Sequence, residues 1–157
     1  MPTPSLAAVL GTGSVLSILG PTGVTPPATP TPIGELTGEP KFEGWKMGLT
    51  TNTNFDSGNV VQSLGTLLDY GSFTSDYNYI SSNAGQLLLI TALKSGVSYD
   101  FTLQLPKQPL LGQTTSGNLY AMSGVVTEAG GFGISQDKTS SSSLSIKLNS
   151  ITFTAGS

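Results

Sequence analysis

Residues 98–105 show the clearest pattern of apolar and polar positions in the chain. Their odd positions are apolar and their even positions polar: Tyr99, Phe101, Leu103 and Leu105 against Ser98, Asp100, Thr102 and Gln104. Residues 72–80 alternate in the same way, with Phe73, Ser75, Tyr77 and Tyr79 opposed to Thr74, Asp76 and Asn78. Successive side chains of a strand point to opposite faces of a sheet, so both stretches predict strands.

The stretch 142–155 also alternates, but its apolar residues change parity. They fall at even positions up to Leu148 and at odd positions from Ile151. A bulge inserts one extra residue into a strand and so exchanges its faces. The pattern therefore predicts a bulge or bend near Asn149 and Ser150.

Residues 83–95 carry the one pattern typical of a helix. Asn83 is suited to the N-cap, with Gln86 three residues later as in a capping box, and Gly96 to a left-handed stop. The expected apolar stripe consists of Ala84, Leu87, Leu88, Thr91 and Leu93. Such a stripe packs on a sheet, so we expect the helix to lie against the apolar side of residues 98–105.

Four further segments have weaker patterns. Residues 14–19 predict a first strand, and residues 21–32 contain five prolines, which predict an extended arm or a long loop. Residues 52–58 predict a polar loop. Residues 59–71 fit either a short helix or an irregular strand.

Two more strands are expected between the proline-rich segment and the polar loop. They are residues 33–40 and 44–51. The turn signal around Pro40 and Lys41 predicts that the two strands pair with each other.

Together these elements predict a mainly β protein. The expected fold is a β-sandwich or partly closed barrel of antiparallel strands with one flanking α-helix, at about 83–95. The 157 residues suit a single domain over 13–155. Within it, residues 1–32 are expected to form an N-terminal arm with the first strand and the Pro-rich loop, and residues 33–157 the β-sandwich domain.

Low charge is the unusual feature of the composition. Charged residues make up 10% of the chain, against about 25% in a typical soluble domain. Either Ser, Thr, Asn and Gln keep the surface soluble, as in a secreted β-domain, or partners cover much of it, because interface cores are depleted of charge. We favour the second explanation. The net charge of −3, with no Arg, also excludes a basic patch for gripping nucleic acid.

The sequence offers few signals for targeting or for disulfides. The apolar stretch near the N-terminus has no positively charged start and is too short to span a membrane, so we expect neither an export signal nor a membrane anchor. The chain has no Cys, so folding does not require an oxidising compartment.

Residue types that carry catalysis are scarce. The chain has no His and no Cys, which excludes Ser-His-Asp and Cys-His arrangements and zinc sites. Ser135 and Lys138 match a Ser-x-x-Lys pattern, but the companion motifs of that enzyme class are absent. The nine carboxylates show no spacing that singles out an acid and a base. We expect no catalytic residue, no cofactor and no metal site.

The order of the segments resembles the major tail tube protein family of long-tailed bacteriophages, in its lambda-like, non-contractile form. The most specific part is the middle of the chain: "DYGSF", a polar turn, an Ala-Gly-Gln-leading helix, "LKSG", and an alternating strand that ends in Leu-Pro. "SGVVTE" and a closing strand with small polar residues follow in the order of the family. The resemblance covers residues 13–155.

The resemblance implies a tail-tube fold, six subunits in a ring, and rings stacked into a tube. Genomic DNA would pass through the lumen without specific binding. It implies a virion protein of the phage tail, assembled in the host cytoplasm. Its partners would be copies of itself, a tape-measure protein, and tail-terminator or tail-tip proteins, with no membrane partner.

A channel through which DNA slides should not bind phosphate. Six copies at −3 carry −18 per ring, and any of this charge that lines the lumen repels the duplex. The lumen candidates are Glu35, Glu39, Glu43 and Asp76, the alternative for each being a solvated outer face.

Contacts between subunits or rings are expected from three segments. These are residues 1–12, the proline-rich segment and the polar loop 51–59. The candidate residues are Pro2, Leu6, Val9, Leu10, Asn54, Phe55 and Asp56.

Three other hypotheses remain open. The chain is the inner-tube subunit of a contractile tail or injection device, which shares the general fold, or a carbohydrate-binding or adhesive β-sandwich, or an enzyme that uses carboxylates. Tubes or six-fold rings would favour either of the two tube hypotheses. A stable monomer that binds glycans would favour the carbohydrate-binding or adhesive β-sandwich.

Overall fold

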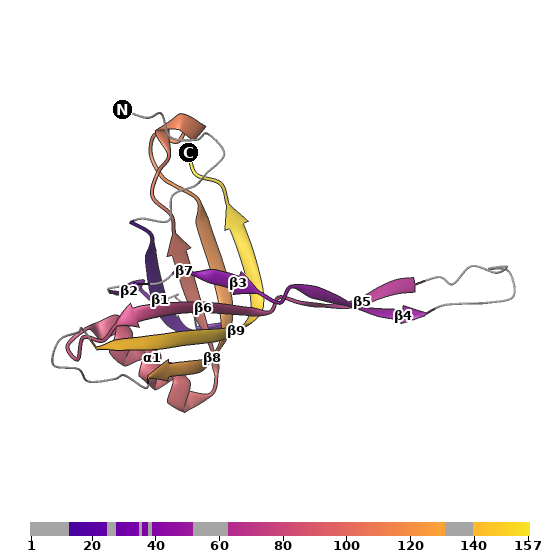
Figure 1. Ribbon diagram of the computed structural model, residues 1–157, viewed down its shortest axis with the longest axis horizontal. Helices are drawn as coiled ribbons and strands as arrows, with labels where there is room; N and C mark the ends of the chain where they lie inside the picture. The colour runs from indigo at the N-terminus through magenta and orange to yellow at the C-terminus, as the bar shows by residue number, and fades with distance from the viewer. Residues whose placement is uncertain (1–12, 25–27, 35, 38, 52–62, 131–139) are drawn as a thin grey trace, which may run out of the picture.

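The computed structural model consists of a strongly curved sheet, one helix and a hairpin that projects from the sheet (Figure 1). It describes residues 13–24, 28–34, 36–37, 39–51, 63–130 and 140–157. Within these ranges no helix is long and apolar enough to cross a membrane.

Seven antiparallel strands form the main sheet, in the order β2-β1-β7-β8-β9-β6-β3. Their bounds are β1 Val15–Pro21, β2 Thr31–Ile33, β3 Lys41–Glu43, β6 Ser72–Asn78, β7 Ser98–Gln104, β8 Leu119–Gly130 and β9 Ser141–Thr154. Strands β4 (Lys46–Thr51) and β5 (Ser63–Asp69) pair only with each other and form the projecting hairpin. The mainly antiparallel β fold with one helix is confirmed.

Strand β9 turns a corner, and the predicted bulge lies at that corner. Ser150 pairs with Ser123 and Leu148 with Gly124, which leaves Asn149 as the extra residue. A second irregularity occurs opposite β9 at Thr127 of β8. Bulges bend and twist a strand. The first half of β9 accordingly runs between β6 and β8, while the second half continues along β8 alone in another direction (Figure 1).

The core lies on the concave side of this curved sheet. The alternation at 98–105 is confirmed, because Tyr99, Phe101 and Leu103 of β7 are buried while the residues between them are less so. The alternation at 72–80 is confirmed in the same way on β6. The largest fully buried apolar and aromatic side chains are Leu16, Ile18, Phe73, Tyr77, Phe101, Leu89, Leu144 and Ile146.

Helix α1 (Ala84–Ser95) covers one end of the core and packs on β8, β2 and β1. Its predicted caps are confirmed: the Asn83 side chain accepts a hydrogen bond from the Gln86 N–H, and Gly96 is left-handed with a φ of 68°. Lys94 lies in the last turn.

The predicted apolar stripe of α1 is partly wrong. The buried residues are Gly85, Gln86, Leu89 and Ala92, whereas Leu87 is about half exposed. Leu88 and Leu93 pack at the margin of the core. The cause is the close approach of the helix to β2, since a Cβ on Gly85 would collide with the backbone of Pro32.

Gln86 is buried because its side chain satisfies backbone groups from two segments. Its Oε1 accepts from the Ile80 N–H at 2.8 Å, and its Nε2 donates to the carbonyls of Asn78 at 2.9 Å and Gly34 at 3.2 Å. The side chain therefore ties the helix to the end of β6 and to the residue after β2. It does not close a reciprocal capping box, because the Asn83 N–H donates to the Ile80 carbonyl instead.

The predicted pairing of residues 33–40 with 44–51 is wrong. Strand β2 pairs with β1, β3 pairs with β6, and β4 pairs with β5, so consecutive segments find partners elsewhere in the chain. The ambiguous segment 59–71 contains a strand, β5. The first predicted strand, at 14–19, corresponds to β1, which lies inside the main sheet beside β7.

Candidate assembly surface

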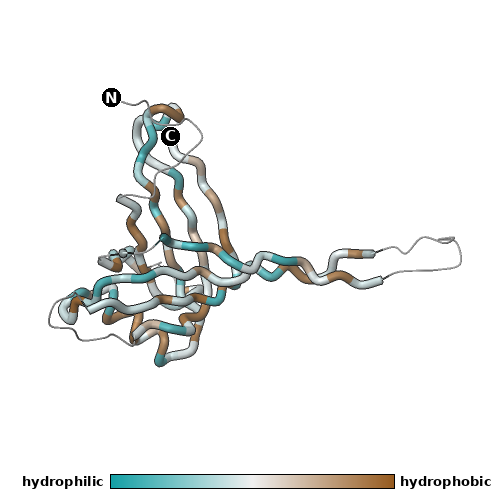
Figure 2. Tube along the Cα trace, in the orientation of Figure 1, coloured by the Kyte–Doolittle hydropathy of each residue, from teal (hydrophilic) through white to brown (hydrophobic). Residues whose placement is uncertain are grey.

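The projecting hairpin, β4 with β5, carries a large group of exposed apolar side chains. Figure 1 shows it standing clear of the sheet, and Figure 2 shows hydrophobic residues along both of its strands. Leu67 is 81% exposed and Leu49 70% exposed. Trp45, Met47, Leu64 and Leu68 are about half exposed, and none of these side chains belongs to the core.

The strand register divides these side chains between two faces. Met47 pairs with Leu68, and Leu49, two residues further along, lies on the same face opposite Gly65. On the other face, Leu64 pairs with Thr50, and Leu67 alternates with Leu68. The face with Met47, Leu49 and Leu68 is therefore the more apolar one, whereas the face with Leu64 and Leu67 also carries Thr50, Lys46 and Asp69.

Two glycines set the direction of the hairpin at its base. Gly44 and Gly71 have φ values of 83° and 71°, a region that favours glycine. They lie against each other, and a Cβ on Gly71 would collide with the carbonyl of Glu43. Trp45 and Tyr70 stack edge to face beside them, with ring centroids 6.0 Å apart. The pairing of β3 with β6 thus ends at this kink. Beyond it the same two chain segments pair again, in a new direction, as β4 and β5.

An ion pair fixes the base of the hairpin to the sheet. The Lys147 ammonium on β9 donates to Asp69 Oδ1 at 2.5 Å, and the Gly71 N–H donates to the same oxygen at 2.8 Å. The Lys147 hydrogen bond and then the Gly71 N–H hold the pKa of Asp69 below its usual value. Both side chains of the pair are nearly half exposed, so it orients the base more than it stabilises the fold.

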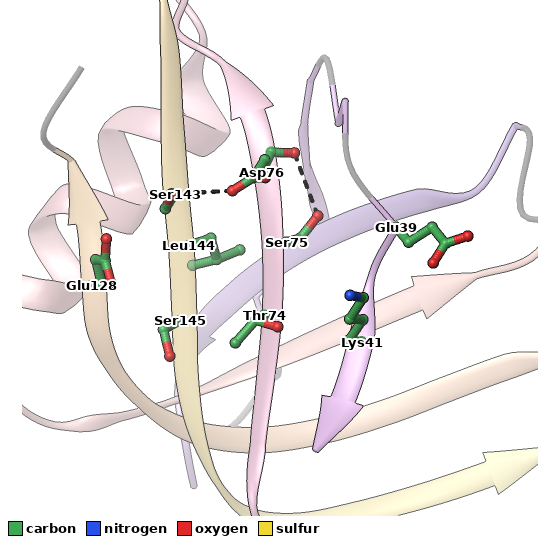
Figure 3. Close-up of a pocket in the computed structure, with 9 residues that line it drawn as sticks. All are labelled: Glu39, Lys41, Thr74, Ser75, Asp76, Glu128, Ser143, Leu144 and Ser145. Carbon is green, nitrogen blue, oxygen red and sulfur yellow. Dashed lines mark hydrogen bonds between the residues drawn. The ribbon is translucent and has the colours of Figure 1, made fainter. Parts of the chain in front are cut away.

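A polar groove of about 430 Å³ lies on the outer surface of β3, β6 and β9 (Figure 3). Glu39, Lys41, Asp76 and Glu128 supply its charges. Asp76 accepts a hydrogen bond from the Ser143 hydroxyl at 3.1 Å. Asp76 faces outward because Ser75 and Tyr77 on either side of it are buried in the core.

The structure thus brings two of the lumen candidates, Glu39 and Asp76, into one groove. Glu43 lies on the same outer surface, because it pairs with Ser72 of β6, two register positions from Thr74 of the groove. Glu35 lies outside the described residues. The position of the lumen relative to this groove stays a prediction.

A second groove, of about 300 Å³, lies over β1, β7, β8 and the second half of β9. It is lined mainly by hydroxyl-bearing and small side chains, and Asp100 is its one charged residue. The Thr22 hydroxyl donates to Asp100 at 2.8 Å. Asp100 also faces outward, because Tyr99 and Phe101 beside it are buried.

The connection between β7 and β8 presents a second exposed apolar patch. Its short 3-10 helix η2 (Pro109–Leu111) exposes Leu110 and Leu111. We call these two residues the loop tip.

Hydrogen bonds from the end of the described chain hold the β7 to β8 connection in place. The Ser157 backbone oxygen accepts from the N–H groups of Thr114, Thr115 and Ser116 at 2.9, 2.7 and 3.0 Å. The loop tip is therefore presented by a connection that is bonded to a neighbouring segment.

The other predicted contact residues cannot be placed. Pro2, Leu6, Val9, Leu10, Asn54, Phe55 and Asp56 all lie outside the described residues. The predicted strand at 44–51 corresponds to β4, and the irregular strand considered for 59–71 contains β5, but the sequence analysis did not predict that the two strands pair with each other and stay exposed. The available signal was that apolar residues occupy both parities of β5, at Leu64, Leu67 and Leu68, with little charge nearby.

The described residues contain no group of three or more His, Cys, Asp or Glu side chains that could hold a metal ion. The exposed apolar hairpin, the loop tip and the two grooves are candidate surfaces for contact with other molecules.

Solved structures of contractile injection systems share this fold. A chain of the anti-feeding prophage (AFP) baseplate, 6-fold symmetrised, has a TM-score of 0.60 at 10% identity, with 99% of this chain and 98% of that chain covered. This chain has the fold of an injection-system component. A chain from the sheath/tube terminator of the PVC extracellular contractile injection system in its extended state gives the same four values.

A chain from the AFP tube terminating cap has a TM-score of 0.61 at 9% identity, covering 99% of this chain and 97% of the other. No protein-family model matches the sequence, and no curated protein matches it. The likeness therefore lies in the fold and extends over nearly the whole chain.

Proposed function

We propose that the chain is a structural subunit of a phage-tail-like injection assembly, in which identical copies form the rings of an inner tube. The observation that carries this proposal is the projecting hairpin with its exposed Leu49, Leu64 and Leu67. An isolated two-stranded hairpin is marginally stable in water, and a contiguous exposed apolar surface marks a contact with another molecule.

The distribution of apolar surface supports assembly of identical copies. The hairpin and the loop tip, Leu110 with Leu111, lie on different sides of the molecule (Figure 1). A contact between unlike surfaces of identical chains is head-to-tail, and it closes into a ring or continues into a filament. The 6-fold symmetrised baseplate that contains a chain of the same fold supports rings of six.

The inner tube of a contractile device is favoured over the tail of a non-contractile phage. The solved chains of the same fold come from contractile injection systems, including a sheath/tube terminator and a tube terminating cap. Sheath and tube components are accordingly the partners expected, in a particle assembled inside a bacterium. A position at one end of the tube is a variant of the same proposal.

The low charge and the residue types fit a structural role. The chain carries 10% charged residues and no His or Cys. Under the proposal, the groove with Glu39 and Asp76 faces the passage, where acidic groups keep polyanions from binding.

Electron microscopy and sedimentation of the purified chain test the proposal. We expect six-fold rings at rising concentration, and stacked tubes if the chain forms the length of the tube. Single rings that do not stack would indicate a position at the tube end. A protein that stays monomeric up to about 1 mM, where a contact worth about 4 kcal/mol is half occupied, would contradict the proposal.

A further inference from the structure

Three successive backbone N–H groups in the connection between β7 and β8 point to one oxygen atom. The N–H groups of Thr114, Thr115 and Ser116 donate to the backbone oxygen of Ser157 at 2.9, 2.7 and 3.0 Å. Consecutive N–H groups that converge in this way form a concavity, called a nest, that binds anions. All three residues are exposed, so the nest lies at the surface of the molecule.

The number of donors indicates a charged acceptor. A peptide carbonyl oxygen has two lone pairs, whereas an ionised carboxylate has about four acceptor positions and a full charge. N–H groups also approach a charged oxygen more closely, at about 2.7 to 2.9 Å. The Ser157 oxygen receives three donors, and the bond from Thr115, at 2.7 Å, is short. The nest thus supplies one donor more than a peptide carbonyl oxygen has lone pairs.

We propose that the nest, Thr114 to Ser116, is a binding site for a chain-terminal carboxylate, which Ser157 fills when the chain ends at that residue. A chain that continues past Ser157 offers the same site only a neutral carbonyl. The site shares no residue with the projecting hairpin, so the inference stands or falls separately from the tube proposal.

The local structure is shaped to bring the end of the chain into the nest. The N–H of Gly156 donates to Asn118 Oδ1 at 3.0 Å, and the same oxygen accepts from Gln113 Nε2 at 2.8 Å. Gln113 is buried. A Cβ on Gly156 would collide with the carbonyl oxygen of Ser116, so the absence of a side chain permits the close approach.

The charges of the two segments that build the site favour an anion. Residues 105–118 and 149–157 contain no Asp or Glu, and Lys107 is their one charged residue. A carboxylate in the nest therefore meets no like charge from either segment.

The bound carboxylate also fixes the segment that presents the loop tip. The Gln113 side chain accepts from the Gln108 N–H at 2.9 Å, and the Gln108 carbonyl accepts from the Leu111 N–H at 2.9 Å. Hydrogen bonds thus connect the nest, through the Gln113 side chain, to the turn that exposes Leu110 and Leu111.

Two proteins of identical sequence test the inference, one ending in the carboxylate of Ser157 and the other in its carboxamide. The carboxamide keeps the shape of the group and removes its charge. Hydrogen exchange of the Thr114, Thr115 and Ser116 amides is followed by NMR in dilute, unassembled protein. We expect about tenfold faster exchange in the carboxamide form, because charge-assisted hydrogen bonds are roughly twice as strong as neutral ones. Equal exchange rates in the two forms would overturn the inference.

Two substitutions serve as matched controls in the carboxylate form. Ser157→Ala keeps the carboxylate and removes the hydroxyl that lies 3.4 Å from the Ser116 hydroxyl, so exchange should stay slow. Gly156→Ala also keeps the carboxylate, but its Cβ displaces the end of the chain, so exchange should accelerate as in the carboxamide form. Fast exchange in Ser157→Ala would assign the protection to the hydroxyl, and slow exchange in Gly156→Ala would show that the chain end is not held in the nest. Either result would overturn the inference.

Discussion

Gln86 illustrates how one buried polar residue joins separate parts of this fold. Its three side-chain hydrogen bonds reach Ile80, Asn78 and Gly34, and only 1% of the residue is exposed. Buried backbone groups are costly when they lose their partners. The residue at the first turn of α1 is therefore structural, although its position resembles that of a capping residue.

Gln86→Leu should lower the free energy of unfolding by about 2 to 4 kcal/mol, because the N–H of Ile80 and two carbonyls lose their partners. Urea denaturation measures the effect. Leu87→Ala, at the adjacent and half-exposed position, is the control and should cost much less. Similar losses for both variants would argue against the hydrogen bonds as the cause.

Tyr77 presents the opposite case. Its ring is fully buried in the core, but its hydroxyl has no hydrogen-bond partner among the described residues. Such a hydroxyl loses its hydration on folding without compensation.

Tyr77→Phe should leave the free energy of unfolding unchanged or raise it by about 1 kcal/mol, since it removes the unpaired oxygen and keeps the ring. Thermal and urea denaturation check this result. Tyr77→Leu also removes the ring and should destabilise the protein by about 2 kcal/mol. A clear loss of stability in Tyr77→Phe would mean that the hydroxyl does find a partner.

Among the elements, the projecting hairpin depends most on its connection to the sheet. Gly44 and Gly71 both have positive φ, but their surroundings differ. A Cβ at position 44 has room, with the Gly71 Cα at 3.5 Å, whereas one at position 71 collides with the Glu43 carbonyl.

Gly71→Ala should therefore destabilise the protein more than Gly44→Ala does. The strain of a positive φ alone amounts to about 1 kcal/mol, and the collision at Gly71 adds about 1 to 3 kcal/mol. Urea denaturation gives the two values. Equal losses would indicate that the backbone relaxes around position 71 and that the kink is not tightly fixed.

Local alternation predicted the elements better than it predicted their partners. The faces of 72–80 and 98–105 and the bulge at Asn149 follow from parity alone, because parity decides which side chains meet the core. The pairing of 33–40 with 44–51 failed because strand neighbours depend on contacts far apart in the sequence. The helix stripe failed because Gly85 allows an approach to β2 that helical periodicity does not encode.

The candidate site was predictable only in part. The sequence analysis groups Glu39 and Asp76 because both are acidic, and the segment just before β3 and strand β6 place them in one groove. The hairpin was missed because the exposure of Leu67 depends on the kink at Gly71, which turns its strand away from the core. A sequence pattern indicates that a residue is apolar, but not that the fold leaves it uncovered.

For the whole molecule, the open question is which outer groove faces the passage of the proposed tube. The groove over β3, β6 and β9 contains four charged residues, whereas the groove over β1, β7 and β8 contains Asp100 alone. Both lie on the outer side of the curved sheet, so a substitution in each can be compared directly.

Asp76→Lys and Asp100→Lys change the charge equally, and only the first should make assembled tubes retain double-stranded DNA. A lysine that faces the passage attracts phosphate, most strongly at low salt. DNA that co-purifies with tubes and resists nuclease is the measure. Retention by the Asp100 variant alone would place the hydroxyl-rich groove in the passage and exclude our assignment of Glu39 and Asp76.

The corner in β9 also affects the cooperativity of unfolding. A single strand, Ser141–Thr154, supplies ladder partners to β6 before the bulge and to β8 along most of its length. The two ends of the main sheet therefore share β9, and unfolding of either end removes hydrogen-bond partners from this strand. Damage at one end should spread to the other, and the body should melt in one cooperative step.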